Sequence, residues 1–178
     1  MLVSIVVNNH NYGRFLRDAI DSALDQKYHS IEVIVVDDGS TDDSRQVMTS
    51  YGDRILPVWK RNGGQGSAFN AGFAKSRGEV VIFLDADDAL LPDAVECIMK
   101  EFRPGVSKVH WPLWRADENL RSTGLLFPPE DPGRRFSRIH AEVWTIDDAE
   151  PADQWKRFFT MVPGNRFTRT RGGAPYQC

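Results

Sequence analysis

Two apolar runs that end in acids decide the fold: Val33-Ile34-Val35-Val36-Asp37-Asp38-Gly39-Ser40 and Val80-Val81-Ile82-Phe83-Leu84-Asp85-Ala86-Asp87-Asp88. Each run is rich in β-branched residues and unbroken by polar ones, as in a strand buried on both faces of a parallel sheet. Ligands of open α/β sheets bind outside the carboxyl ends of such strands, so acids there predict a site. Three acids so close together favour a hard divalent cation, Mg²⁺ or Mn²⁺.

Strand and helix patterns alternate through about the first hundred residues. Apolar runs predict strands at 2–7, 31–36, 55–59 and 79–84, and helical spacing predicts helices at 13–26, 41–51, 66–76 and 92–102. Ser40 or Thr41 is expected to cap the second helix, with acids in its first turn, and Pro92 to start the fourth. The alternation predicts an α/β fold: a mostly parallel sheet with helices on both faces.

The pattern weakens after Pro104, so we expect two units, residues 1–104 and residues 105–178. The second unit shows strand-like runs at 106–114 and 121–126, a loop at 127–138 rich in proline, glycine and charge, and a short helix at 154–161.

The composition is that of an ordinary globular protein, with 178 residues, of which 41% are hydrophobic and 26% charged. A formal net charge of −3 gives no reason to expect a nucleic-acid partner. The apolar run at 2–7 is too short for a signal peptide or a membrane span. Cysteine is rare, which fits a reducing compartment, and we expect a cytoplasmic protein.

Polar turns follow the first two predicted strands, at 2–7 and 31–36. The turn Asn8–Asn11 offers amide donors and acceptors, which suit the edge of a nucleobase, and His10 either stacks on a base or packs under the turn. Asp37 has the position of an Asx-turn residue before Gly39. Asp38 fits the same turn, but its carboxylate also suits a ligand N–H group.

A glycine-rich loop, Asn62-Gly63-Gly64-Gln65-Gly66-Ser67, precedes the third predicted helix. Backbone N–H groups of Gly63 and Gly64 could approach a diphosphate or a sugar, and a plain tight turn is the alternative. The spacing matches neither a dinucleotide-binding fingerprint nor a P-loop.

Taken in order, these motifs resemble glycosyltransferase family 2 over about the first hundred residues. The matching segments are Val3-Ser4-Ile5-Val6-Val7 with Asn11, Phe15-Leu16, Ala19-Ile20-Asp21-Ser22, Gln26, Val35 to Asp42, Asn62-Gly63-Gly64 with Asn70-Ala71-Gly72, Gly78-Glu79, and Phe83 to Asp88. Each motif alone is common, but the ordered set is specific. The resemblance implies the GT-A fold, a Rossmann-like nucleotide-binding half joined to an acceptor-binding half, and the second half of this chain is expected to be incomplete.

The resemblance implies nucleoside contacts for Asn8 and His10, and it implies that Asp38 reads uracil. Gly63 and Gly64 are the matching backbone positions near the nucleotide-sugar.

The Asp-x-Asp motif of the family binds the ribose and a metal on the diphosphate. The resemblance therefore places Asp85 and Ala86 at the nucleotide-sugar and makes Asp87 a ligand of Mn²⁺ or Mg²⁺, with Asp85 and Asp88 in support. Asp88 also has the position of a residue that bonds into a helix start, and an isolated Asp-x-Asp is often a solvated turn.

Two departures from the family pattern stand out. Phe69 precedes Asn70 where the family often has arginine, so a cationic contact to the diphosphate would fall to Lys60 or Arg61.

The second departure concerns the catalytic base, which the family carries in the second half. Pro163–Phe167 resembles the stretch before that acidic motif, and the chain ends soon after it. Asp147 and Asp148 are the remaining acidic candidates, although they lie upstream of the expected place and a solvated helix cap is the favoured reading.

The expected function is inverting, metal-dependent transfer of a sugar from a nucleotide-diphospho-sugar, preferably a UDP-sugar, to a hydroxyl of a carbohydrate or lipid-linked acceptor, in polysaccharide or glycoconjugate synthesis. The acceptor could bring the protein to a membrane periphery. The alternative is a module that binds the donor without transferring the sugar, because the base is missing. A truncated chain would expose apolar surface, so self-association is also expected.

Overall fold

A computed structural model of the chain describes residues 1–102, 109 and 113–127. Its elements are β1 (Val3–Asn9), α1 (Gly13–Leu24), β2 (Ile31–Asp38), α2 (Ser44–Thr49), a 3₁₀ turn η1 (Gly52–Arg54), β3 (Leu56–Lys60), α3 (Gln65–Phe73), β4 (Val80–Asp85), α4 (Ala94–Glu101), β5 (Leu113–Ala116) and β6 (Ser122–Phe127).

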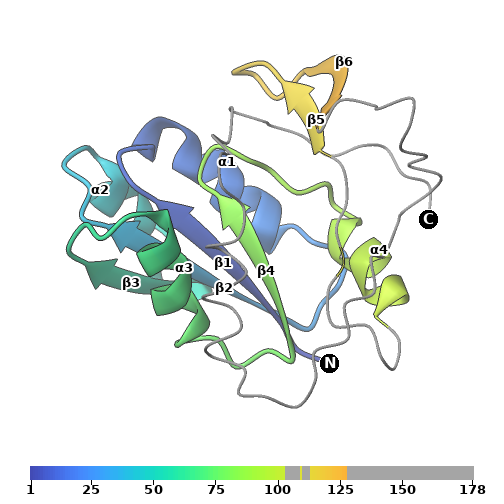
Figure 1. Cartoon of the computed structure of the whole chain (residues 1–178), viewed down its shortest axis with the longest axis horizontal. Helices are drawn as coiled ribbons and strands as arrows, with labels where there is room; N and C mark the ends of the chain where they lie inside the picture. The colour runs from blue at the N-terminus through green and yellow to red at the C-terminus, as the bar shows by residue number, and fades with distance from the viewer. Residues whose placement is uncertain (103–108, 110–112, 128–178) are drawn as a thin grey trace.

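The first four strands form one parallel sheet in the order β3-β2-β1-β4, which confirms the predicted α/β architecture (Figure 1). The register aligns the strands' carboxyl ends, because Asn8 lies opposite Asp85, and Asp38 lies opposite Lys60. Strands β5 and β6 form a separate antiparallel pair.

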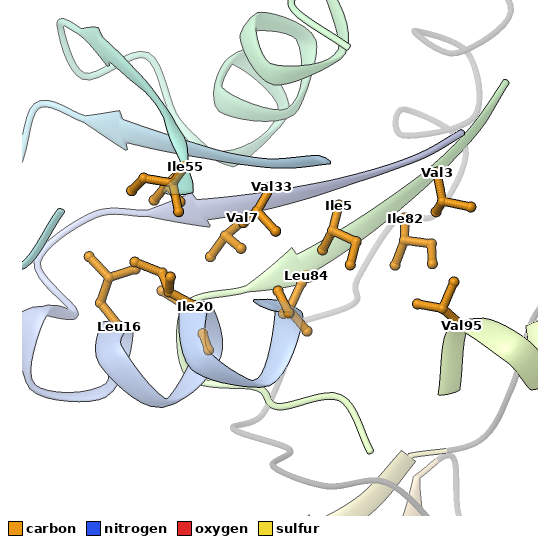
Figure 2. Close-up of a cluster of buried hydrophobic side chains, with 14 of the residues drawn as sticks. Val3, Ile5, Val7, Leu16, Ile20, Val33, Ile55, Ile82, Leu84 and Val95 are labelled. Carbon is orange, nitrogen blue, oxygen red and sulfur yellow. The ribbon is translucent and has the colours of Figure 1, made fainter. Parts of the chain in front are cut away.

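Alternate residues of the central strands build the larger core against α1, α2 and α4. Figure 2 shows Ile5 and Val7 of β1, with Ile82 of β4, directed toward Ile20 of α1 and Val95 of α4. These side chains are almost fully buried. Burial of a large aliphatic side chain contributes roughly 1.5–3 kcal/mol, so this layer is a main source of stability.

Among the described elements, α3 packs against the opposite face of the sheet. Val6, Ile34 and Val36 contact Ala68 and Phe69 of this helix. The ring of Phe69 also meets the ring of Phe83 edge-on, with centroids 4.8 Å apart. The two helical layers therefore cover both faces of the sheet, as the alternation predicted.

Gly72 sets how closely α3 approaches the sheet. A Cβ atom at this position would lie 2.2 Å from Cγ1 of Val6 and 3.0 Å from Cγ2 of Val36. Both neighbours are buried and cannot retreat into solvent. Only glycine allows this spacing, which brings the last turn of α3 against β1 and β2.

The structure corrects several predicted boundaries. Helix α2 begins at Ser44 after the N-cap Asp43, not after Ser40 or Thr41, and its first turn holds no acid. Ser40 is unavailable as a cap because its hydroxyl accepts hydrogen bonds from Asn9 and Asn11.

Helix α4 begins at Ala94 rather than at Pro92, whose carbonyl instead accepts a hydrogen bond from the Lys27 amide. The strand expected at 106–114 is described only as β5, which begins at Leu113. Strands β1 and β2 run two residues further than predicted, so Asn9 and Asp38 belong to the sheet.

Several expectations fall outside the described residues: the loop at 127–138, the helix at 154–161, the segment 163–167, and the candidate bases Asp147 and Asp148. The division of the chain at 104 stays a prediction. Among the helices that the structure describes, none is long and apolar enough to cross a membrane.

We predict that Gly72→Ala lowers the free energy of unfolding by about 1–3 kcal/mol, because the added methyl overpacks the interface with Val6. Gly66→Ala is the matched control on the same helix, since its Cβ would meet nothing within 4 Å. That variant should gain about 0.5–1 kcal/mol from reduced chain entropy. Urea denaturation of both variants measures the difference, and equal stabilities would contradict the packing argument.

Candidate functional site

The polar residues at the strand ends divide between the two faces of the sheet. Side chains alternate along a strand, so Asn8, Asp38, Lys60 and Asp85 share a face with the apolar residues that pack on α3. Asn9 and Asp37 lie on the opposite face, toward α1. The α3 face therefore carries a row of four polar side chains across β3, β2, β1 and β4.

Asp85 is the meeting point at one end of this row. Its Oδ1 accepts hydrogen bonds from Nδ2 of Asn8 at 2.5 Å and from Nε2 of Gln65 at 2.9 Å. Burial raises the pKa of Asp85, the two amide donors oppose that shift, and the nearby charge of Asp87 adds to it. In this environment, a neighbouring cation would stabilise the ionised form of the Asp85 carboxyl.

Asp87 and Asp88 lie in the turn that leaves β4, both partly buried. The Asp88 amide donates to the Asp85 carbonyl at 3.0 Å, which closes the turn and keeps the three acids together. Within the described residues, no group of three or more His, Cys, Asp or Glu side chains could hold a metal ion alone. The acids fit a Mg²⁺-type site, in which one or two carboxylates share the ion with phosphate oxygens and water.

The segment after the acids is tied to α1. The Leu90 amide donates to Oγ of Ser22 at 3.0 Å, and Gln26 donates through Nε2 to the Leu91 carbonyl at 2.7 Å. Oε1 of Gln26 accepts from the Val95 amide at 3.0 Å. Ser22 and Gln26 matched the family motif without an assigned role, and the structure shows that they anchor the acidic turn.

Asp38 holds the glycine-rich loop. Asp38 is only 2% exposed, and its carboxylate forms an ion pair with the Lys60 ammonium. It also accepts hydrogen bonds from the backbone amides of Gly63 at 3.0 Å and Gly64 at 2.8 Å. Burial opposes ionisation of this carboxyl, but the Lys60 and Gly63 hydrogen bonds and the Lys60 charge outweigh it and lower the pKa of Asp38. The Gly63 and Gly64 amides are therefore directed at Asp38 in this structure.

Gly64 ends the loop with φ of +82° immediately before α3. This backbone conformation is strained for residues with a Cβ, so glycine is needed where the loop enters the helix. The next residue, Gln65, is the one that reaches Asp85. The loop thus connects the β2–β3 end of the polar row to its β4 end.

A second polar network braces the turn after β1 on the α1 face. Asn9, 1% exposed, donates to Oδ1 of Asp37 at 3.3 Å and to Oγ of Ser40 at 3.0 Å. The Ser40 amide donates a hydrogen bond to Oδ1 of Asp37 at 3.3 Å, as in the predicted Asx-turn. The Thr41 amide donates to Asn11 at 2.7 Å. Sequence reasoning singled out Asp37 and missed the role of Asn9.

The side chain of His10 is exposed to solvent beside the polar row. Nδ2 of Asn62 lies 3.0 Å from Nε2 and 3.2 Å from Nδ1 of its ring, so the turn after β1 meets the glycine-rich loop here. Ala86 is buried, and its amide donates to the Asn8 carbonyl at 3.1 Å. The structure therefore brings Asn8, His10, Asp38, Gly63, Gly64 and Asp85–Asp88 to one edge of the sheet. Gln65, which had no individual assignment, also belongs to this edge.

We predict that Asp38→Asn destabilises the fold by about 3–5 kcal/mol at pH 7, because a buried charge pair loses one partner. The lowered pKa means that the ionised Asp38 stabilises the native state above its ordinary value of 3.8, and that this contribution disappears as the pH falls through the folded-state pKa. The difference in unfolding free energy between wild type and variant should therefore shrink below about pH 4. Denaturation at several pH values tests this, and a constant difference would contradict the ion pair.

Known proteins resemble this chain over its first part. An uncharacterized glycosyltransferase of Nostoc sp. is 49% identical over 107 residues, which are 58% of this chain and 33% of the relative. The chondroitin synthase of Pasteurella multocida is 41% identical over 104 residues, which are 57% of this chain and 11% of that protein. The chain thus spans a third or less of the length of these relatives.

Solved structures agree with this likeness. Residues 1–349 of S. aureus TarS, in complex with UDP-GlcNAc, superpose with a TM-score of 0.51 at 27% identity, over 56% of this chain and 30% of that solved chain. A mannosyltransferase from Pyrobaculum calidifontis, solved with GDP-Man and Mn²⁺, has a TM-score of 0.52 at 24% identity, over 58% of this chain and 33% of the enzyme, and so shares the fold. The family model for glycosyl transferase family 2 matches residues 4–148, and the chain belongs to that family.

Proposed function

We propose that this chain carries the donor site of a divalent-metal-dependent glycosyltransferase that uses a nucleotide-diphospho-sugar. The observation that supports this most is the row of Lys60, Asp38, Asn8 and Asp85 along the carboxyl ends of four parallel strands. An open parallel sheet binds ligands at this edge. The acids of the β4 turn add the chemistry that a charged diphosphate requires.

The metal is proposed to be Mn²⁺ or Mg²⁺, with Asp87 as its ligand and Asp85 and Asp88 in support. When bound, such an ion neutralises charge on the diphosphate and on the nucleoside diphosphate that departs. The partly buried Asp85 carboxyl, whose pKa is raised, gains from a neighbouring cation.

A UDP-sugar is the preferred donor in this proposal, as in the UDP-GlcNAc complex of TarS. Asn8 and His10, at the sheet edge, are proposed to contact the nucleoside, and Asp38 is proposed to accept the uracil imide N–H. Asp38 is already engaged with Lys60 and the Gly63 amide, so base binding would involve this whole group. Lys60 supplies the positive charge beside it.

The reaction proposed is transfer with inversion, in which an acceptor hydroxyl of a carbohydrate or lipid-linked acceptor attacks the anomeric carbon as a carboxylate removes its proton. The products would enter polysaccharide or glycoconjugate synthesis. Within the described residues, the side chains at the sheet edge bind and orient the donor. Asp147 and Asp148 remain the proposed candidates for the base.

Donor binding without transfer is the second candidate, and it is favoured by one observation. The proposed donor contacts all lie between Asn8 and Asp88, at one edge of the parallel sheet. The proposed candidates for the base, Asp147 and Asp148, lie in the second part of the chain. Release of UDP from a UDP-sugar with acceptor present would favour the enzyme, and tight binding without release would favour the module.

We predict that Asp87→Ala abolishes the Mn²⁺-dependent part of UDP binding and leaves the fold intact, because the side chain lies in a turn and not in the core. Calorimetry with Mn²⁺ and with chelator measures that part directly. Asp53→Ala is the control, because Asp53 is an exposed acid of η1, away from the acidic turn. A variant that still responds to Mn²⁺ like wild type would refute the assignment of Asp87.

A further inference from the structure

We propose that Gln65 is a positioning residue that fixes the orientation of the Asp85 carboxylate for metal-dependent donor binding. The inference rests on the proposed function and adds a residue to it. Gln65 is the first residue of α3, and its Nε2 donates to Oδ1 of Asp85 at 2.9 Å. This hydrogen bond joins the first residue of α3 to the last residue of β4.

The geometry divides the two oxygens of Asp85 between two tasks. Oδ1 receives both amide donors, Gln65 from α3 and Asn8 from the neighbouring strand β1. Two donors on one oxygen hold the carboxylate plane from two directions, so the carboxylate cannot rotate without breaking a hydrogen bond. Oδ2 is thereby left for a ligand. Outer-shell donors of this kind orient the carboxylates that bind metals.

The position of Gln65 is itself built into the fold. Gly72 lets α3 lie close to Val6 and Val36, and Asp38 binds the amides of Gly63 and Gly64 just before the helix. These contacts hold the first turn of α3 above the strand ends. The glutamine side chain then spans the remaining distance to β4, and movement of the loop would be transmitted to Asp85.

The first test needs no ligand. In nuclear magnetic resonance spectra, the side-chain amide of Gln65 should move toward the position of a free glutamine in Asp85→Ala, and the Asn8 amide should shift in Gln65→Met, which keeps the length of the side chain but removes the donor. Unchanged Gln65 amide signals in Asp85→Ala would overturn the proposed contact.

The second test separates metal-dependent from metal-independent binding. Calorimetry with UDP should show that Gln65→Met weakens binding in Mn²⁺ by roughly 10–100-fold, the usual effect of losing an outer-shell partner, and leaves binding in chelator unchanged. Gln46→Met is the matched control, because Gln46 is an exposed glutamine on α2. Equal losses in Mn²⁺ and chelator would show general damage to the loop and overturn the positioning role.

The two proposals fail differently in this experiment. If UDP binding to the wild-type chain is the same with and without Mn²⁺, the proposed metal-dependent function is overturned, together with the role of Gln65 in it. A wild-type chain that responds to Mn²⁺, together with a Gln65→Met variant that responds equally, overturns the role of Gln65 alone.

Discussion

The register of β1 between β2 and β4 is the constraint on which the candidate site depends. Because all three strands are parallel and aligned, Asn8 lies opposite Asp85, and Asn9 lies opposite Asp37. A shift of one residue would turn each polar side chain to the other face and bury it under the wrong helix. Both faces of β1 are packed, Ile5 and Val7 toward α1 and Val6 toward α3, so the apolar core determines where the polar groups meet.

Two aspartates at this edge show how neighbours control the charge of one residue type. Asp38 and Asp85 are both taken out of water, which alone raises the pKa of either carboxyl. Asp38 has an ammonium and two backbone amides, and its pKa falls. Asp85 has two neutral amide donors and a second acid nearby, and its pKa rises. Lys60 compensates the charge of Asp38 within the chain, whereas the described contacts of Asp85 are two neutral amides and a nearby acid.

Sequence patterns could predict the strands, because runs such as Val33–Val36 are unbroken and bounded by turn residues. The parallel topology then predicted that the acids at the strand ends meet at one edge of the sheet. The contacts of Asp85 could not be predicted, since Asn8 and Gln65 are 77 and 20 residues away and meet it only through register and helix packing. The start of α2 was missed for a similar reason: Ser40 has the chemistry of a cap, but Asn9 and Asn11 engage its hydroxyl.

The glycine-rich loop ties these observations together. It matches neither common phosphate-binding pattern, and its amides at Gly63 and Gly64 bind a carboxylate of the chain itself. The Asp38 carboxylate thus takes the position at the loop amides that a bound anion would otherwise have. The loop is held in place by this carboxylate of the chain itself. The ordered loop then carries Gln65 to Asp85. A ligand that engaged Asp38 would compete for the same amides, so under the proposed function a base bound at Asp38 and a metal bound beside Asp85 would be linked through α3.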